Sequence, residues 1–219
     1  MGGTFINNGG KGTDYSQQPA PPTAGQVNPT AAKQGTAASD DGKSCGTHAG
    51  QGVTGAIGNT GGLGQSGGNG GAANQIKLTM AEMIGDYTYT TNGGNGGGGQ
   101  TGGQGGPGQI GGPGGGGSSH CDPGPQGIGG PGGTGGDGGD GGSGGDAGQI
   151  YITYTSGNPN ISASVNPGTA GVAANPGGGG IGGAGITQGG TGDPGKHGKT
   201  LSPGKGGQIY VNGKQLPPV

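Results

Sequence analysis

Glycine recurs at every third position over long stretches of this chain, and this spacing constrains the fold more than any other feature. The runs cover 46–70, 93–117, 124–148 and 168–207. Glycine supplies 72 of the 219 residues and the hydrophobic fraction is 23%, whereas ordinary globular chains are near half apolar. An ordinary packed core is therefore excluded. The chain must either stay disordered or be held together by backbone hydrogen bonds.

The residues between the periodic glycines distinguish two kinds of extended helix. In 124–148 a second position is also almost all glycine, and only the third position carries larger side chains, from Pro125 to Asp146. A collagen triple helix needs one glycine face and proline-rich others. Two faces made almost entirely of glycine and one face with larger side chains favour polyglycine II helices that pack side by side. A collagen triple helix is the alternative.

Segments with strand chemistry separate the glycine runs. They alternate β-branched and aromatic residues with a period of two and fall in 75–91, 149–165 and 208–212, with Thr4–Ile6 at the start. The predicted fold class is a fold of non-globular composition. It is a bundle of about six polyglycine II/polyproline II helices in three hairpins, with a small β-sheet at one end and no α-helix of note.

We expect a single elongated domain over 1–219, in which 1–45 forms a Pro-rich first arm and tip. Because the apolar and Tyr side chains gather in the strand segments, the core is predicted at the sheet. Its predicted members are Ile76, Leu78, Tyr87, Tyr89, Ile150, Ile152, Tyr154, Ile161, Val165, Ile209 and Val211.

A mirror-image pattern predicts how two of the glycine runs pair. If 93–117 and 124–148 fold back around residue 119, the facing positions sum to 238. The pattern P-x-x-I-x-x-P then meets itself, although chance recurrence in a low-complexity sequence is the alternative. The predicted apolar contacts are Pro107 with Pro131, Ile110 with Ile128, and Pro113 with Pro125.

An offset of 59 residues aligns Gln149 with Gln208 and, upstream, aligns aspartates with lysines. Exposed ion pairs contribute about 0.2–1 kcal/mol each, so the larger effect of such a ladder would be to fix the register. Two independently solvated charged faces are the alternative. The predicted salt-bridge ladder is Asp137 with Lys196, Asp140 with Lys199, and Asp146 with Lys205.

The two cysteines, Cys45 and Cys121, each precede a glycine run of the same length that ends near a strand segment. Both should therefore lie at the same far end of the molecule, where a disulfide would clamp two tips. Two unpaired thiols are one alternative. A Zn²⁺ site that adds His48 and His120 is another.

The chemistry of an enzyme is missing from the sequence. The string G-x-G-x-x-G lacks the strand and helix that frame a dinucleotide site, and no G-x-S-x-G elbow occurs. We therefore expect no enzyme, no cofactor and no metal. The net charge is −2 and no basic patch with aromatics exists, which argues against nucleic acid as a partner. No secretion signal and no apolar run of ~20 residues is visible, which argues against a membrane partner.

The run G-G-P-G-G-T-G-G-D-G-G-D-G-G-S-G-G-D and the segments Y-T-Y-T-T and Q-I-Y-I-T-Y-T resemble polyglycine II helical-bundle proteins. Such proteins include the Gly-rich domains of bacteriophage tail-fibre adhesins, whose tip loops contact host receptors. They also include springtail antifreeze proteins, which are small bundles clamped by disulfides. The antifreeze bundles lack the strand segments seen here, and the N-terminal attachment domain of the phage adhesins is not found.

The expected function is that of a non-enzymatic structural protein, extracellular or on a virion surface, that self-associates into a fibre or surface coat. Its partners would be copies of itself, since exposed strand edges are templates for another chain, and Thr4–Ile6 and 208–212 are the candidate strands. The alternative is a phage or cell-surface adhesin whose loops 36–45, 118–123 and 184–188 bind a receptor or glycan. An ice-binding (antifreeze) protein ranks third, because the faces mix Asp, Lys, Gln and Ile.

Overall fold

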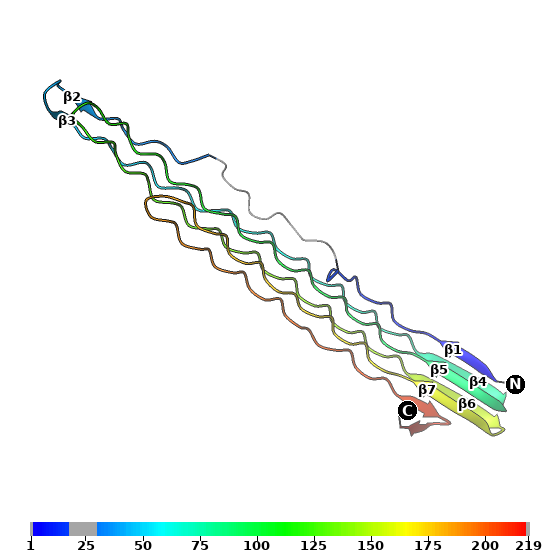
Figure 1. The fold of residues 1–219 in the computed structure, drawn as a ribbon. Coiled ribbons are helices and arrows are strands. Elements are labelled where there is room, and N and C mark those ends of the chain that lie inside the picture. The colour runs from blue at the N-terminus through cyan, green and yellow to red at the C-terminus, as the bar shows by residue number, and fades with distance from the viewer. Residues whose placement is uncertain (1, 18–29, 218–219) are drawn as a thin grey trace.

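The computed structural model describes residues 2–17 and 30–217, and in it the chain runs back and forth six times along one long axis (Figure 1). We call these traverses passes. Odd-numbered passes lead away from the end that carries most strands, here called the sheet end, and even-numbered passes return to it. The described parts of pass 1 are 2–17 and 30–38. Passes 2 to 6 cover 45–82, 85–117, 121–156, 159–183 and 189–211.

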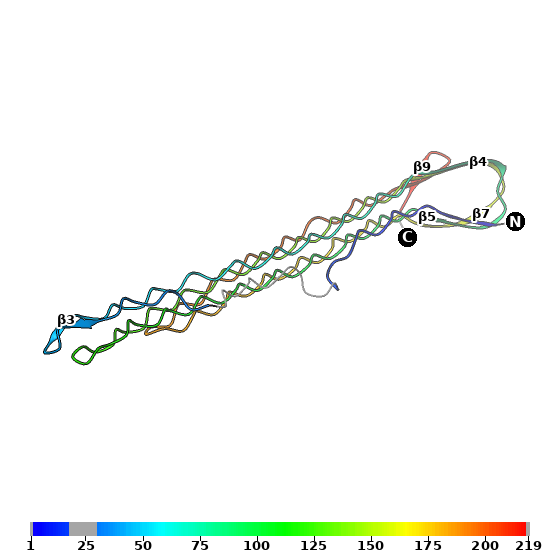
Figure 2. The same ribbon diagram turned by 90° about the horizontal axis from the view of Figure 1, so that it is seen from above.

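Backbone hydrogen bonds between passes arrange the molecule in two layers, which Figure 2 shows from above. Passes 1, 3 and 5 form one layer and passes 2, 4 and 6 form the other. Within a layer the neighbours are parallel and the bonds recur every third residue, as from Gly96 N to Thr169 O at 2.9 Å. Between layers the neighbours are antiparallel, as shown by the 2.8 Å bond from Gly130 N to Gln109 O.

The sheet end contains one sheet from each layer. The first layer forms a three-stranded parallel sheet in the order β1 (Gly3–Ile6), β5 (Gly85–Thr90) and β7 (Pro159–Ser164). The second forms a four-stranded sheet in the order β4 (Ile76–Glu82), β6 (Ile150–Ser156), β8 (Ile209–Val211) and β9 (Lys214–Leu216), of which only β9 is antiparallel to its neighbour. At the far tip, β2 (Ser39–Asp40) pairs with β3 (Cys45–Thr47) in an antiparallel hairpin.

The hydrophobic core lies between the two sheets of the sheet end. Tyr89 and Ile150 are fully buried there, and Ile152 is 1% exposed. Every core residue predicted from the sequence belongs to this cluster or packs against it, so the predicted core is confirmed. Met83 and Ala163 complete the cluster but were not predicted, because Met83 lies between β4 and β5 and Ala163 is small.

The predicted fold class is wrong. The prediction was a bundle of about six polyglycine II/polyproline II helices with one small sheet. The described residues instead contain nine strands in three sheets and no helix. The reason lies in where the backbone hydrogen bonds go, since the glycine-rich passes are extended segments bonded to neighbouring passes. Strand pairing also occurs at both ends of the molecule. Across 2–17 and 30–217, no helix is long and apolar enough to cross a bilayer.

Glycine is required where the passes meet. A Cβ added to Gly132 would lie 1.9 Å from the carbonyl oxygen of Gly180, far inside van der Waals contact. Gly190 accepts a hydrogen bond from Gly132 N at 2.8 Å, but a Cβ added to Gly190 would meet no described atom within 4 Å. These two glycines on neighbouring passes therefore have different roles. Gly132 permits the close approach of two backbones, and Gly190 lies on the outer surface.

Candidate functional site

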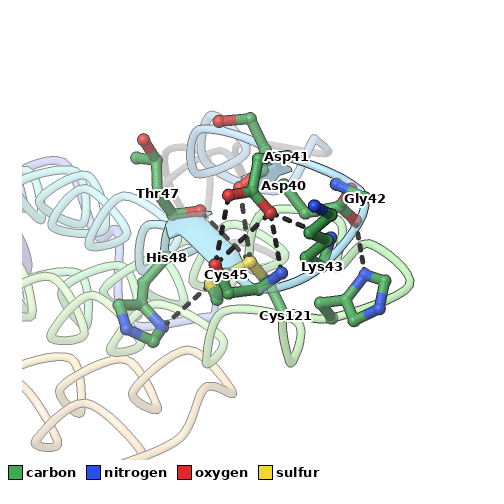
Figure 3. A network of polar contacts seen from close by, with 11 residues as sticks. Asp40, Asp41, Gly42, Lys43, Cys45, Thr47, His48 and Cys121 are labelled. Atoms are coloured by element: carbon green, nitrogen blue, oxygen red, sulfur yellow. Dashed lines mark hydrogen bonds and ion pairs between the residues drawn. A yellow bond between two sulfur atoms is a disulfide. The ribbon is translucent and has the colours of Figure 1, made fainter.

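The far tip joins two loops through a disulfide (Figure 3). Cys45 opens β3 and Cys121 follows the turn after pass 3, and their Cα atoms lie 5.0 Å apart although 76 residues separate them in sequence. The predicted disulfide is present. Because both sulfurs are in this bond, the alternative Zn²⁺ site with His48 and His120 lacks its thiolate ligands. Within the described ranges, no group of three or more His, Cys, Asp or Glu could hold a metal ion.

A tight turn shapes the loop between β2 and β3. Gly42 adopts a φ of +80°, which favours glycine. The Asp41 carboxylate accepts hydrogen bonds from the backbone N–H of Lys43 at 2.9 Å and of Ser44 at 2.7 Å, as Figure 3 shows. These two amides hold the pKa of Asp41 below its usual range. The turn is therefore organised by a carboxylate that stays ionised.

Asp40 connects the two loops of the tip. The Ser118 side chain beside it, followed by the Gly42 amide at 3.0 Å, lowers the pKa of Asp40, and His120 Nδ1 lies 3.6 Å from its carboxylate. A carboxyl group whose pKa is lowered on folding contributes stability above its unfolded pKa of about 3.9. That contribution is lost as the pH falls through the lowered value, so the junction is fully formed at neutral pH.

The predicted ladder residues lie side by side at the predicted offset, but their contacts differ from ion pairs. Each aspartate Oδ1 accepts a hydrogen bond from the backbone N–H of its lysine. In the part of the chain that the structure describes, no Nζ of these lysines lies within 4.0 Å of a carboxylate. The bonds are Lys196 N to Asp137 at 2.7 Å, Lys199 N to Asp140 at 2.6 Å, and Lys205 N to Asp146 at 2.7 Å.

Other short polar side chains make the same kind of contact, which the sequence reasoning missed. Asn69 Oδ1 accepts from Ser143 N at 2.9 Å, and Asn95 Oδ1 accepts from Thr169 N at 3.0 Å. In each case the N–H belongs to an outward-facing residue, which occurs at every third position of a pass. Such an N–H has no backbone carbonyl of a neighbouring pass to bond with. The recurrence of Asn, Asp and Ser at outward positions was the available signal.

The apolar contacts predicted across the second hairpin are replaced by glycine contacts. A Cβ added to Gly108 would lie 1.9 Å from Gly130 O, so the layers meet through bare backbone. Ile110 and Ile128 are 47% and 42% exposed, and Ile110 lines a surface pocket with Ile181 of pass 5. The larger side chains of passes 3 and 4 lie on outer surfaces of different layers. The pairs Pro107 with Pro131, Ile110 with Ile128, and Pro113 with Pro125 are therefore not formed.

The third loop predicted to lie at the tip does not reach it. The turn at 184–188 ends short of β2 and β3 in both views (Figures 1 and 2). Ile186 N donates to Gly127 O at 3.1 Å, which places this turn beside pass 4 rather than beside Cys121. The tip therefore consists of the two disulfide-linked loops.

An open backbone edge lies at the sheet end. β4 is the terminal strand of its sheet, with β6 as its partner among the described strands. Ile76 N donates to Gln149 O at 2.9 Å. Because successive residues of a strand present their N–H groups to opposite edges, the N–H groups of Lys77 and Thr79 face the open edge.

The core is also less covered along this side of the sandwich. The inward side chains Leu78 and Met80 of β4 are half-buried, whereas Ile150 of β6 is fully buried. In the facing sheet, Phe5 of β1 stacks on Tyr89 with ring centroids 5.1 Å apart and still remains 36% exposed. Another strand added beside β4 would cover apolar surface as well as pair with the backbone.

No protein-family model matches this chain, and no curated protein matches it. Among solved structures, it has a low similarity to a springtail antifreeze protein from Granisotoma rainieri described as a nine polyproline type II helical bundle. The identity is 22% over 87% of this chain and 93% of that chain, with a TM-score of 0.13. This is weak support for the resemblance to glycine-rich bundle proteins, and a score this low carries no argument about fold or function.

Proposed function

We propose that this chain is a non-enzymatic, extracellular structural rod that self-associates through the open edge of its β-sandwich. The observation that carries the proposal is β4, a seven-residue strand at the end of its sheet. Open edges of this kind pair readily with a strand of another chain. Pairing here would also bury the half-covered side chains of Leu78 and Met80.

The opposite edge of the same sheet is protected by comparison. It ends in β9, which has three residues and follows a turn with positive φ at Asn212 and Gly213. Very short edge strands are a common protection against edge-to-edge pairing, whereas β4 has seven residues. Association is therefore expected at β4.

The variant Thr79→Pro tests this proposal. Proline removes the N–H that faces the open edge and leaves the hydrogen bonds between β4 and β6 in place, which is why edge strands tolerate it. We expect the unsubstituted protein to assemble into oligomers or filaments, as seen by sedimentation velocity and electron microscopy. Thr79→Pro should lose the association that depends on the β4 edge and should form no filaments.

Thr101→Pro is the matched control, because Thr101 is exposed on pass 3, away from β4, and its N–H has no acceptor in the described part of the chain. Its assembly should equal that of the unsubstituted protein. If the unsubstituted protein stays monomeric at millimolar concentration, or if Thr79→Pro assembles as well as Thr101→Pro, the proposal fails.

A further inference from the structure

One outer face of the rod carries two parallel columns of opposite charge. Asp137, Asp140 and Asp146 lie on pass 4, and the lysines 59 residues further on lie beside them on pass 6. The passes are held in this register by backbone bonds such as Gly138 N to Lys196 O at 2.9 Å. Rungs three residues apart are separated by at most about 10 Å. The face is therefore a stripe of negative charge next to a stripe of positive charge.

The charges of this face are largely unused within the chain. Each aspartate accepts one hydrogen bond, through Oδ1, whereas an ionised carboxylate can accept about four. Lys196, Lys199 and Lys205 are exposed. In the ranges that the structure describes, their ammonium groups have no carboxylate within 4.0 Å. Both columns are thus available to a partner with the reverse pattern.

A second copy of the same face presents that reverse pattern. A two-fold axis parallel to the passes, placed between the two columns, sets the aspartates of each copy opposite the lysines of the other at the same level. Closed two-fold interfaces of this self-complementary kind are the commonest in soluble oligomers. At each level the dimer therefore contains two aspartate–lysine contacts, one from the aspartate of each copy to the lysine of the other.

The rest of the two columns is compatible with this packing. By the same 59-residue offset, Ser143 would face Ser202 of the other copy and Thr134 would face Asp193, so no like charges are opposed. Pro131 would face Gly190, beside which there is open space. The apposed surfaces are therefore complementary in charge and in side-chain size along several successive rungs.

We propose that two copies of this chain pair face to face through these Asp and Lys columns, in parallel, with their sheet ends together. This lateral contact deepens the proposed function, because it rests on self-association and names a second surface that serves it. Edge pairing at β4 would extend an assembly at the sheet end, and face pairing would double the rod.

Sedimentation velocity on the Thr79→Pro background tests the face separately from the β4 edge. We expect dimers whose dissociation constant rises at least tenfold between about 50 and 500 mM NaCl, because salt screens exposed charges. Replacing Lys196, Lys199 and Lys205 together by Glu should give monomers, since it opposes like charges while keeping the backbone N–H groups that bond to the aspartates.

The matched control changes the same net charge elsewhere, by replacing Lys33, Lys43 and Lys214 with Glu, and it should still form dimers. Monomers in the Thr79→Pro protein at low salt, or dimers that ignore both salt and the column charges, would overturn the face proposal while leaving β4 pairing standing. If Thr79→Pro does not fold, the same charge series in the unsubstituted chain decides, because only face pairing predicts a response to these three lysines and not to the control.

Discussion

At the scale of single residues, position within the period of three decides what each residue does. Glycines at the two inward positions let backbones approach closely, and the outward position carries the polar and larger side chains. The sequence alone supplied this division and the 59-residue register. It could not show that Asp140 bonds to a backbone N–H and not to an ammonium group, because a sequence does not reveal which amides lack a backbone acceptor.

Alanine substitutions at Gly132 and Gly190, which lie side by side on passes 4 and 6, should have opposite effects on the free energy of unfolding. Gly132→Ala places a Cβ against the Gly180 carbonyl and should lower the free energy of unfolding by about 3 kcal/mol, since overpacking forces the backbone to shift. Gly190→Ala meets open space and should raise it by about 0.4–1 kcal/mol, because alanine restricts the unfolded chain. Urea denaturation followed by circular dichroism measures both. Equal effects at the two positions would contradict this assignment of inner and outer glycines.

At the scale of elements, the strands of the sheet end except β9 were predictable, and those of the tip were not. Alternating Ile, Tyr and Thr residues marked β4 to β8, because a half-buried strand demands that pattern. β2 and β3 are Ser39–Asp40 and Cys45–Thr47, which have no alternation to detect. They pair because the Asp41 turn reverses the chain between them. The hairpin was missed because it depends on local polar contacts, which a hydrophobic pattern does not record.

Removing the disulfide should loosen the tip and leave the sheet end intact. In Cys45→Ser/Cys121→Ser, the two loops keep the contacts of Asp40 but lose their covalent link. The cost should be about 2–4 kcal/mol, the usual contribution of a native disulfide. Hydrogen exchange should accelerate at residues 39–47 and 118–121 and remain unchanged in β5 and β6. Faster exchange throughout the core would show that the disulfide does more than clamp the tip.

At the scale of the whole molecule, two layers of parallel passes end in two different structures. Apolar packing is concentrated between the sheets at one end, and a disulfide links the loops at the other. Between them, backbone hydrogen bonds take the place of a hydrophobic core. The open β4 edge and the charged columns lie on this frame, which is why we propose association through the surface of the rod and not through a pocket.

The central claim is that this hydrogen-bonded backbone lattice is the folded state, and residue-resolved amide hydrogen exchange tests it most directly. In pass 3, Gly102 N and Gly103 N bond to Asn175 O and Gly62 O at 3.0 and 2.8 Å, while Thr101 and Gln104 face outward. Two protected amides followed by one that exchanges at least about tenfold faster should therefore repeat along 93–112. Uniformly fast exchange, or protection without a period of three, would contradict the lattice.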